Sequence, residues 1–282
     1  MTPSRPDRTS DPCDRHVLVF DSGVGGLSVS AAIRARLPDV AQTYLADDAF
    51  RPYGDKTEAQ LHARIPSLLG TLCARIEPDL VVVACNTAST TALPAIRAAL
   101  DMPVVGVVPA IKPAAAGLCT GSAEGAGGIG VLGTPGTVRR AYVDALIDRY
   151  ASHCAVRLRG SVALVEEAER KLRGQAADPA VIAAEIAPLF RGSPISAVVL
   201  ACTHFPLLRD ELVAAAPYPV DWIDSGDAVA RRVDSLLSGM NAPRRVPSID
   251  GTAWLTAPNT DAARAAAFAD YGFPRLRALD WP

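Results

Sequence analysis

Two segments of the chain place a cysteine at the end of an apolar run, and this pattern carries most of the chemical information in the sequence. Residues 80–84 lead into Cys85, residues 197–201 lead into Cys202, and small polar residues follow each cysteine. Each segment predicts a buried strand, a tight turn and the start of a helix. A thiol in that position, beside the N–H groups of a helix, has its thiolate form stabilised.

A pair of such thiols favours one kind of reaction over others. A single cysteine could be a nucleophile, whereas two cysteines on opposite sides of a small molecule could act as base and acid at one carbon. One thiolate would remove a proton from one face while the opposite thiol delivers a proton to the other face, which inverts the stereocentre. An ordinary thiol pKa of about 8.5 needs little shift for this work. We therefore expect Cys85 and Cys202 to form an acid–base pair.

Polar residues near each cysteine could assist it. Asp21 ends the first predicted strand, His204 follows Cys202 by two residues, and Glu166 or Glu167 precedes the second cysteine strand. The glycines at positions 23, 25 and 26 would expose N–H groups to a substrate carboxylate, with Asp21 receiving its ammonium group. The neutral hydrogen-bonding candidates are Ser22, Asn86, Thr87, Thr134, Thr137 and Thr203.

These residues need a scaffold in which strand ends face each other. Apolar runs alternate with helical patterns along the chain, which predicts parallel sheets with right-handed crossovers. The strand–loop–helix at 17–37 recurs at 129–150, and Val19 and Val131 are separated by nearly the same number of residues as Cys85 and Cys202. Such a spacing indicates a duplicated unit.

The fold class that we predict is α/β, with two pseudo-symmetric domains, mainly parallel sheets flanked by helices, and the active site in the cleft between them. Residues 15–109 with 222–282 would form the first domain and residues 110–221 the second, while residues 1–14 would be a mobile tail. We expect residues after Ser238 to be irregular except for an edge strand at 254–257 and a helix at 261–271.

Composition and residue spacing limit the kinds of molecule that this protein is expected to bind. A net charge of −2 and 5% aromatic residues argue against nucleic acid, and the sequence has neither a membrane-span candidate nor a secretory segment, so we expect a cytoplasmic protein. No C-x-x-C pair occurs and the four histidines lack ligand spacing, so no metal is expected. None of the three lysines ends a predicted strand, which disfavours pyridoxal phosphate; the partner expected is a small molecule.

Six segments also carry a family resemblance. They are residues 20–29 (FDSGVGGLSV), 52–54 (PYG), 84–89 (ACNTAS), 133–137 (GTPGT), 164–166 (LVE) and 201–208 (ACTHFPLL). In this order and number, the segments make the chain resemble the glutamate racemases of bacterial cell-wall synthesis, within the aspartate/glutamate racemase superfamily. The resemblance covers about residues 16–230.

The resemblance implies cofactor-independent interconversion of L- and D-glutamate, with D-glutamate feeding peptidoglycan synthesis. It implies that Cys85 and Cys202 are the proton donor and acceptor, assisted by Asp21, Glu166 and His204. The implied substrate contacts are Asp21, Ser22, Tyr53, Gly54, Asn86, Thr87, Thr203 and His204, with Pro52, Thr134 and Thr137 as further candidates. We also expect a homodimer.

Alternatives stay open at this point. The protein could racemise aspartate or another amino acid, although aspartate racemases usually carry Glu where His204 stands. It could be a hydrolase or decarboxylase that uses one cysteine, or a non-catalytic protein that binds an amino acid. Residues 159–163 lack the Cys-Pro lead that is usual in the family, which leaves Glu167 as an alternative to Glu166. Asp47 and Asp48 are expected on the solvated surface.

Overall fold

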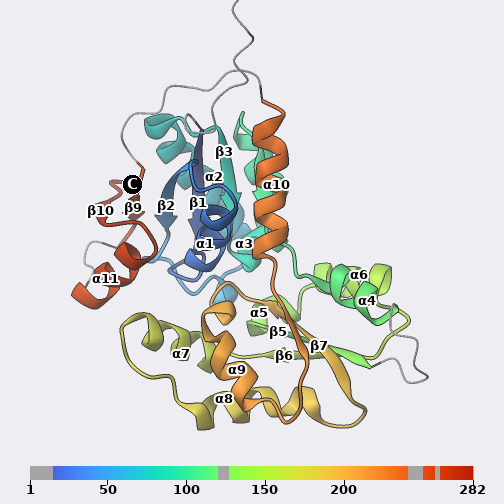
Figure 1. The fold of residues 1–282 in the computed structure, drawn as a ribbon. Helices are drawn as coiled ribbons and strands as arrows, with labels where there is room; N and C mark the ends of the chain where they lie inside the picture. The colour runs from blue at the N-terminus through green and yellow to red at the C-terminus, as the bar shows by residue number, and fades with distance from the viewer. Residues whose placement is uncertain (1–14, 120–126, 241–249, 258–260, 282) are drawn as a thin grey trace, which may run out of the picture.

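The computed structural model describes residues 15–119, 127–240, 250–257 and 261–281, so the predicted tail at residues 1–14 lies outside the described residues. Two parallel sheets lie one above the other in Figure 1, and helices cover both faces of each. In these ranges no helix combines the length and the apolar character that crossing a bilayer requires. The predicted α/β class is confirmed.

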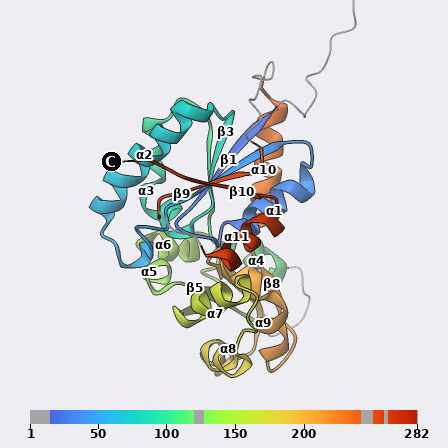
Figure 2. The same ribbon diagram turned by 90° about the vertical axis from the view of Figure 1, so that its left-hand side faces the viewer.

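The first sheet has six strands in the order β10-β9-β2-β1-β3-β4. Their bounds are β1 His16–Asp21, β2 Ala41–Ala46, β3 Leu80–Val83, β4 Val104–Gly106, β9 Thr252–Leu255 and β10 Arg275–Ala278. Helices α1 (Leu27–Arg36), α10 (Gly226–Ser238) and α11 (Ala262–Asp270) cover one face, and α2 (Glu58–Ile76) and α3 (Asn86–Ala99) cover the other (Figure 2). The central strands β1 and β3 are buried along their whole length, as their continuous apolar runs require.

The second sheet has four strands in the order β6-β5-β7-β8. Their bounds are β5 Gly128–Gly133, β6 Val156–Gly160, β7 Ile195–Ala201 and β8 Asp221–Ile223. Helices α4 (Ile111–Cys119) and α6 (Ala141–Tyr150) cover one face, and α7 (Ala163–Leu172), α8 (Pro179–Ile186) and α9 (Arg209–Ala215) cover the other. Shorter helical segments are η2 (Tyr53–Asp55), α5 (Pro135–Val138), η3 (Ala187–Phe190) and η4 (Phe205–Leu208).

The duplication expected from the sequence is visible in the strand order. The run β2-β1-β3-β4 of the first sheet corresponds to β6-β5-β7-β8 of the second. In each sheet the strand that leads to a cysteine, β3 or β7, pairs in parallel with the strand that leads to a loop of glycine and hydroxyl residues, β1 or β5. Because the carboxyl ends of parallel strands share one edge, each sheet brings its cysteine and its polar loop together.

Helix α2 shows how local sequence sets an element that supports the site. Thr57 caps its first turn, because its hydroxyl accepts from the N–H of Gln60 while the Gln60 side chain accepts from the N–H of Thr57. Leu61, Ile65 and Leu68 then recur at helical spacing and are fully buried against the first sheet. This helix also carries Arg64, which pairs with Asp47 in the loop after β2.

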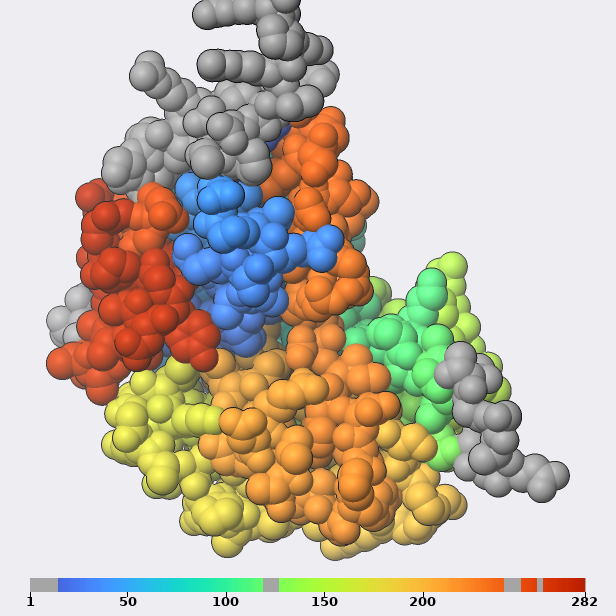
Figure 3. Space-filling view, viewed as in Figure 1, coloured from blue at the N-terminus to red at the C-terminus, as the bar shows by residue number. Residues whose placement is uncertain are grey.

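The described residues of the C-terminal segment form β9, α11 and β10, one strand more than the sequence indicates. Strand β9 lies between β2 and β10, so the predicted edge strand is an interior one. In Figure 3 this segment (red) packs beside the N-terminal part of the chain and above α7 (yellow). The expectation for Asp47 and Asp48 is wrong: these residues are 0% and 6% exposed, because the C-terminal segment covers them.

Candidate active site

A cleft of about 630 Å³ lies between the two sheets and is lined by both Cys85 and Cys202. Most of the substrate contacts expected from the sequence line the same cleft. They are Ser22, Pro52, Tyr53, Gly54, Asn86, Thr87, Thr134, Thr137, Thr203 and His204. Residues more than 100 positions apart therefore meet in one cavity.

Cys85 enters the cleft from the first sheet as the N-cap residue of α3 and is 5% exposed. Its Sγ lies 3.5 Å from the hydroxyl oxygen of Ser22. Burial raises the pKa of this thiol to about 12, and the nearby charge of Asp21 acts in the same direction. Cys85 is therefore a neutral thiol at physiological pH and is suited to donating a proton.

Asp21 lies behind the cleft, contrary to the expectation that it contacts substrate. It is 0% exposed and does not line the cavity. Its carboxylate accepts the N–H of Gly23 at 2.8 Å and the hydroxyl of Thr203 at 3.1 Å. Alternation along β1 explains this, because Asp21 points to the same face as Val17 and Val19, toward α1. Burial raises the pKa of Asp21, an effect that the charge of His204 opposes.

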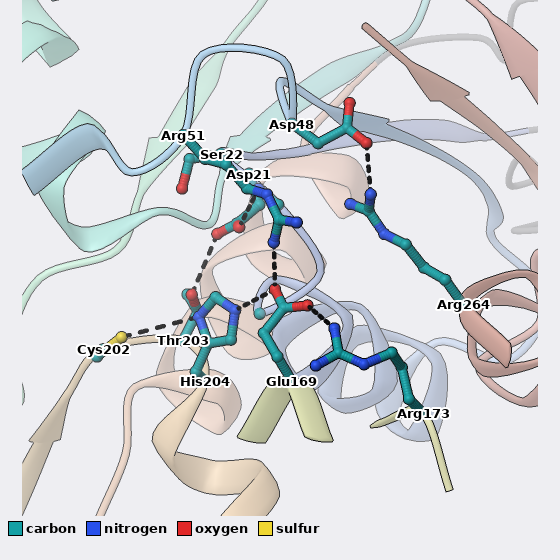
Figure 4. Close-up of polar contacts among 12 residues, drawn as sticks. Asp21, Ser22, Asp48, Arg51, Glu169, Arg173, Cys202, Thr203, His204 and Arg264 are labelled. Carbon is teal, nitrogen blue, oxygen red and sulfur yellow. Dashed lines mark hydrogen bonds and ion pairs between the residues drawn. The ribbon is translucent and has the colours of Figure 1, made fainter. Parts of the chain in front are cut away.

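Cys202 enters from the second sheet and has a charged neighbour. Its Sγ lies 3.9 Å from Nδ1 of His204, whose Nε2 lies 3.3 Å from Oε1 of Glu169 (Figure 4). Burial lowers the pKa of His204, but its contacts with Cys202 and Glu169 outweigh burial and raise that pKa to about 10. His204 is therefore an imidazolium at neutral pH, and its positive charge stabilises negative charge on Sγ of Cys202.

The carboxylate that contacts His204 belongs to Glu169, a residue that our sequence reasoning missed. Glu166 lines the cleft one helical turn earlier on α7, but the described hydrogen bonds of His204 do not include it. Glu167 instead accepts the backbone N–H of Asp178. Spacing alone cannot choose between Glu166 and Glu169, because residues three apart lie on the same side of a helix.

Glu169 is held by two arginines as well as by His204. Arg51, from the loop after β2, contacts Oε1 at 2.8 Å, and Arg173 contacts Oε2 at 3.6 Å (Figure 4). Burial raises the pKa of Glu169, but the hydrogen bond and charge of His204, together with Arg51, prevail and lower it to about 2. The pair is thus carboxylate and imidazolium, and the Arg51 contact joins the two domains across the mouth of the cleft.

Neutral polar groups line the remaining wall. Thr134 caps α5, and its hydroxyl lies 3.0 Å from that of Thr137, which lies 3.3 Å from that of Thr87. The side-chain oxygen of Asn86 is buried and has no hydrogen-bond partner among the described residues. Asn86 also begins α3, so the first turn of this helix borders the same cavity. Together these groups suit a ligand with both carboxylate and ammonium groups.

The cleft also contains residues to which the sequence analysis assigned no individual role. They are Arg51, Asp55, Pro135, Gly136, Val162, Val165, Glu169, Arg170 and Arg173. Gly136 allows the two domains to approach, since a Cβ there would lie 2.8 Å from the carbonyl oxygen of Gly54. Within the described part of the chain, no group of three or more His, Cys, Asp or Glu side chains is placed to hold a metal ion.

Comparisons with known proteins agree with this geometry. The sequence profile of the Asp/Glu/Hydantoin racemase family matches residues 27–233. A glutamate racemase of Sphingopyxis alaskensis is 51% identical over 240 residues, which cover 84% of this chain and 87% of that protein. A glutamate racemase of Brucella canis is 45% identical over 254 residues, covering 89% and 90%.

Solved structures show the same fold. Escherichia coli glutamate racemase, crystallised with L-glutamate and the activator UDP-MurNAc-Ala, superposes with a TM-score of 0.86 at 42% identity, covering 94% of this chain and 98% of that one. Glutamate racemase isoform RacE1 from Bacillus anthracis gives a TM-score of 0.75 at 27% identity, covering 95% and 98%. In both comparisons the similarity extends over nearly the whole of each chain.

Proposed function

Since the chain belongs to the Asp/Glu/Hydantoin racemase family, we propose that it interconverts L- and D-glutamate by proton transfer between Cys85, the substrate α-carbon and Cys202. The observation that carries this proposal is that both thiols line one cleft while their surroundings differ in charge. D-Glutamate made in this way would supply peptidoglycan synthesis, the role typical of the family.

The charge difference assigns the starting roles. Cys202, which lies beside the imidazolium of His204, acts as the base and removes the α-proton from the face of the substrate turned toward it. Cys85 begins as the thiol and delivers its proton to the opposite face of the resulting carbanion. The α-carbon is then inverted, Cys202 holds the proton, and Cys85 carries the negative charge. After the product leaves, proton exchange of the two sulfurs with solvent restores the starting state, and the reverse reaction uses the same groups in exchanged roles.

The supporting residues act on these two protonation states. Glu169 keeps His204 protonated, and Arg51 and Arg173 hold Glu169 in place. The positive charge of His204 is therefore in place beside Cys202 before substrate arrives. Ser22 could stabilise the Cys85 thiolate after transfer, since its hydroxyl lies within contact distance of that sulfur. Glu166 remains a candidate for substrate contact from the same wall of the cleft.

The substrate would be bound by polar groups that line the cleft. The Asn86 side chain could accept from the ammonium group, and N–H groups in the first turn of α3 could donate to the α-carboxylate. The hydroxyl groups of Thr87, Thr134 and Thr137 could donate to a carboxylate in the same cavity. A dicarboxylic amino acid fits this set because the wall has several donors in addition to the acceptor oxygen of Asn86.

The direct test is to follow the optical signal of L-glutamate with the purified protein, without pyridoxal phosphate and with a chelator present. We expect the signal to decay to zero, and D-aspartate and D-alanine formation should be measured in parallel. A change confined to aspartate or alanine would identify a different amino-acid racemase. Unchanged L-glutamate that is nevertheless bound would point to a non-catalytic protein.

Variants of the two cysteines test the two-base scheme. Cys85→Ser and Cys202→Ser should each lose more than about a thousandfold in steady-state racemisation, the upper range for removing an acid or base. In D₂O each should still exchange the α-proton of one enantiomer faster than that of the other. If only one of the two substitutions abolished turnover, a one-cysteine hydrolase or decarboxylase mechanism would fit better.

We further propose that the protein works in the cytoplasm as a homodimer. The proposed chemistry needs reduced thiols at Cys85 and Cys202, and the cytoplasm maintains thiols in that state. Analytical ultracentrifugation at several protein concentrations would test the homodimer.

A further inference from the structure

The wall of the cleft formed by Tyr53 and Gly54 is backed by a buried network of charges. At its centre is Asp47, the residue after β2, which is completely buried and does not line the cleft. Burying a carboxylate without partners costs much free energy, so Asp47 must be paired and hydrogen-bonded. Its partners show which parts of the structure it connects.

Three side chains meet at the Asp47 carboxylate. Arg64 of α2 binds both oxygens, with Nε donating to Oδ2 and Nη2 to Oδ1 at 2.7 Å each. The hydroxyl of Tyr53 donates to Oδ2 at 2.6 Å, and that of Thr256 donates to Oδ1 at 2.8 Å. A bidentate arginine–carboxylate pair has fixed geometry as well as charge, so it holds the carboxylate in one orientation.

The C-terminal segment contributes further to this network. Thr256 follows β9, and its hydroxyl also accepts the N–H of Ala49 at 3.0 Å. Arg64 is stacked between the rings of Phe50 and Trp281, with its guanidinium carbon 4.5 and 4.4 Å from their centres. Residues about 200 positions later in the chain therefore enclose the loop that leads to Tyr53.

A parallel connection is made by the next residue. Asp48 accepts from Arg264 of α11 at 2.7 Å, as Figure 4 shows, and from the N–H of Ala257 at 2.8 Å. The loop after β2 thus has one carboxylate bound to each of two C-terminal elements. Of the two, only Asp47 bonds directly to a residue of the cleft wall.

From this arrangement we propose that Asp47 is a positioning residue for substrate binding. Its carboxylate is held by Arg64 and Thr256 and in turn fixes the Tyr53 hydroxyl. This contact keeps the cleft wall at residues 52–54 in place. The inference rests on the proposed function, because its measure is the turnover of glutamate. It assigns the C-terminal segment a part in substrate binding without direct contact with substrate.

The position of the wall at residues 52–54 determines which kinetic constant should change when Asp47 is replaced. Tyr53 and Gly54 lie in the cleft but are not part of the thiol pair, so their contacts would be equal in the ground state and the transition state. Loss of such uniform binding raises KM and leaves kcat nearly unchanged. A defect in the thiol pair, in contrast, would lower kcat.

Asp47→Asn tests the inference, because the amide keeps the size of the side chain and removes its charge. We expect KM for L-glutamate to rise by about fivefold or more, with kcat within about twofold of wild type. Thr256→Val is a milder variant that removes one hydroxyl, and it should raise KM by about threefold on the same reasoning. Melting temperatures should be recorded for both variants.

A double-mutant cycle distinguishes positioning from general destabilisation. If Asp47 acts through the Tyr53 hydroxyl, Asp47→Asn should change KM much less in a Tyr53→Phe background than in wild type. Thr252→Val is the matched control, since this β9 hydroxyl bonds to Arg275 outside the network, and it should leave KM unchanged.

The outcomes separate the two proposals. A wild-type protein that does not turn over glutamate would overturn the proposed function, and this inference with it. Normal wild-type turnover together with an unchanged KM in both Asp47→Asn and Thr256→Val would overturn the inference alone. So would an equal effect of Asp47→Asn in both Tyr53 backgrounds, or a fall in kcat with KM unchanged.

Discussion

Replacing Glu169 by glutamine would test whether a carboxylate keeps His204 charged. The substitution preserves the size of the side chain and an oxygen near Nε2, which in the native protein lies 3.3 Å from the carboxylate. What is lost is the negative charge that, together with Cys202, raises the pKa of His204 to about 10 against the effect of burial. The perturbation therefore isolates the electrostatic part of the contact.

The expected magnitude follows from the strength of such contacts. A hydrogen bond to a charged group contributes about 1.5–3 kcal/mol, and one pKa unit corresponds to about 1.4 kcal/mol. The pKa of His204 should therefore fall by about 1 to 2 units in Glu169→Gln, on these two values. As pH rises, the variant loses the imidazolium earlier, and the Cys202 thiolate loses its stabilising partner.

NMR titration of the imidazole signals measures this directly in the free protein, and the chain has only four histidines to assign. The decline of kcat/KM at high pH should begin at lower pH in Glu169→Gln than in wild type. Titration of the substrate amine affects the pH profile of every variant equally. The effect of Glu169 is therefore the difference between the kcat/KM profiles of the variant and the wild type.

Glu166→Gln is the matched control, because it removes a carboxylate from the same cleft one helical turn away. It should leave the His204 titration where it is in wild type. An unshifted His204 in Glu169→Gln, or the same shift in both variants, would refute the assignment of Glu169.

Three further outcomes are expected. Iodoacetamide should alkylate Cys202 before Cys85, as peptide mapping would reveal, since a thiol with a pKa of about 12 is only about one part in 10⁴ thiolate at pH 8; faster reaction at Cys85 would contradict the assigned starting roles. Burial lowers the pKa of His16 to about 4, so the unfolded chain binds more protons between about pH 6.5 and 4, and stability should fall by about 2–3 kcal/mol as pH falls to 4.5. Urea unfolding at pH 7 and 4.5 should therefore show that the free energy of unfolding falls less in His16→Gln than in wild type. An equal fall in both proteins would exclude His16 as the cause. Gly136→Ala should lower kcat/KM about tenfold or more, because misplacing a cleft wall by about 1 Å has effects of that order, whereas Gly70→Ala, where a Cβ meets nothing within 4 Å, should not change it.

Much of the fold could be predicted because its signals are local. Continuous apolar runs at β3 and β7 indicate buried parallel strands, and the small polar residues after Cys85 and Cys202 mark the turns into the next helix. The repeated spacing revealed the duplication, which the matching strand orders confirm. Since parallel strands present their carboxyl ends at one edge, the edge of each sheet that carries its cysteine also followed from the sequence.

Side-chain direction limited the prediction of the site. Asp21 stands beside the glycine loop in sequence, yet alternation along β1 turns it behind the cleft, where its bonds to Gly23 and Thr203 satisfy it. The choice between Glu166 and Glu169 depends on how far α7 lies from His204. That distance is set by packing between the second sheet and its helices, which helical periodicity does not encode.

The sequence alone therefore determined the α/β architecture and the two cysteine turns, because each depends on residues within a few positions of one another, and the duplication, because the same local patterns occur twice along the chain. Tertiary structure decided which carboxylate meets His204 and that Asp47 is buried. Both depend on segments that meet only after folding: Glu169 meets Arg51 across the cleft, and Asp47 meets Thr256 from the C-terminal segment. A charge near a chain turn is exposed or buried according to what later packs over it, and no local pattern carries that information.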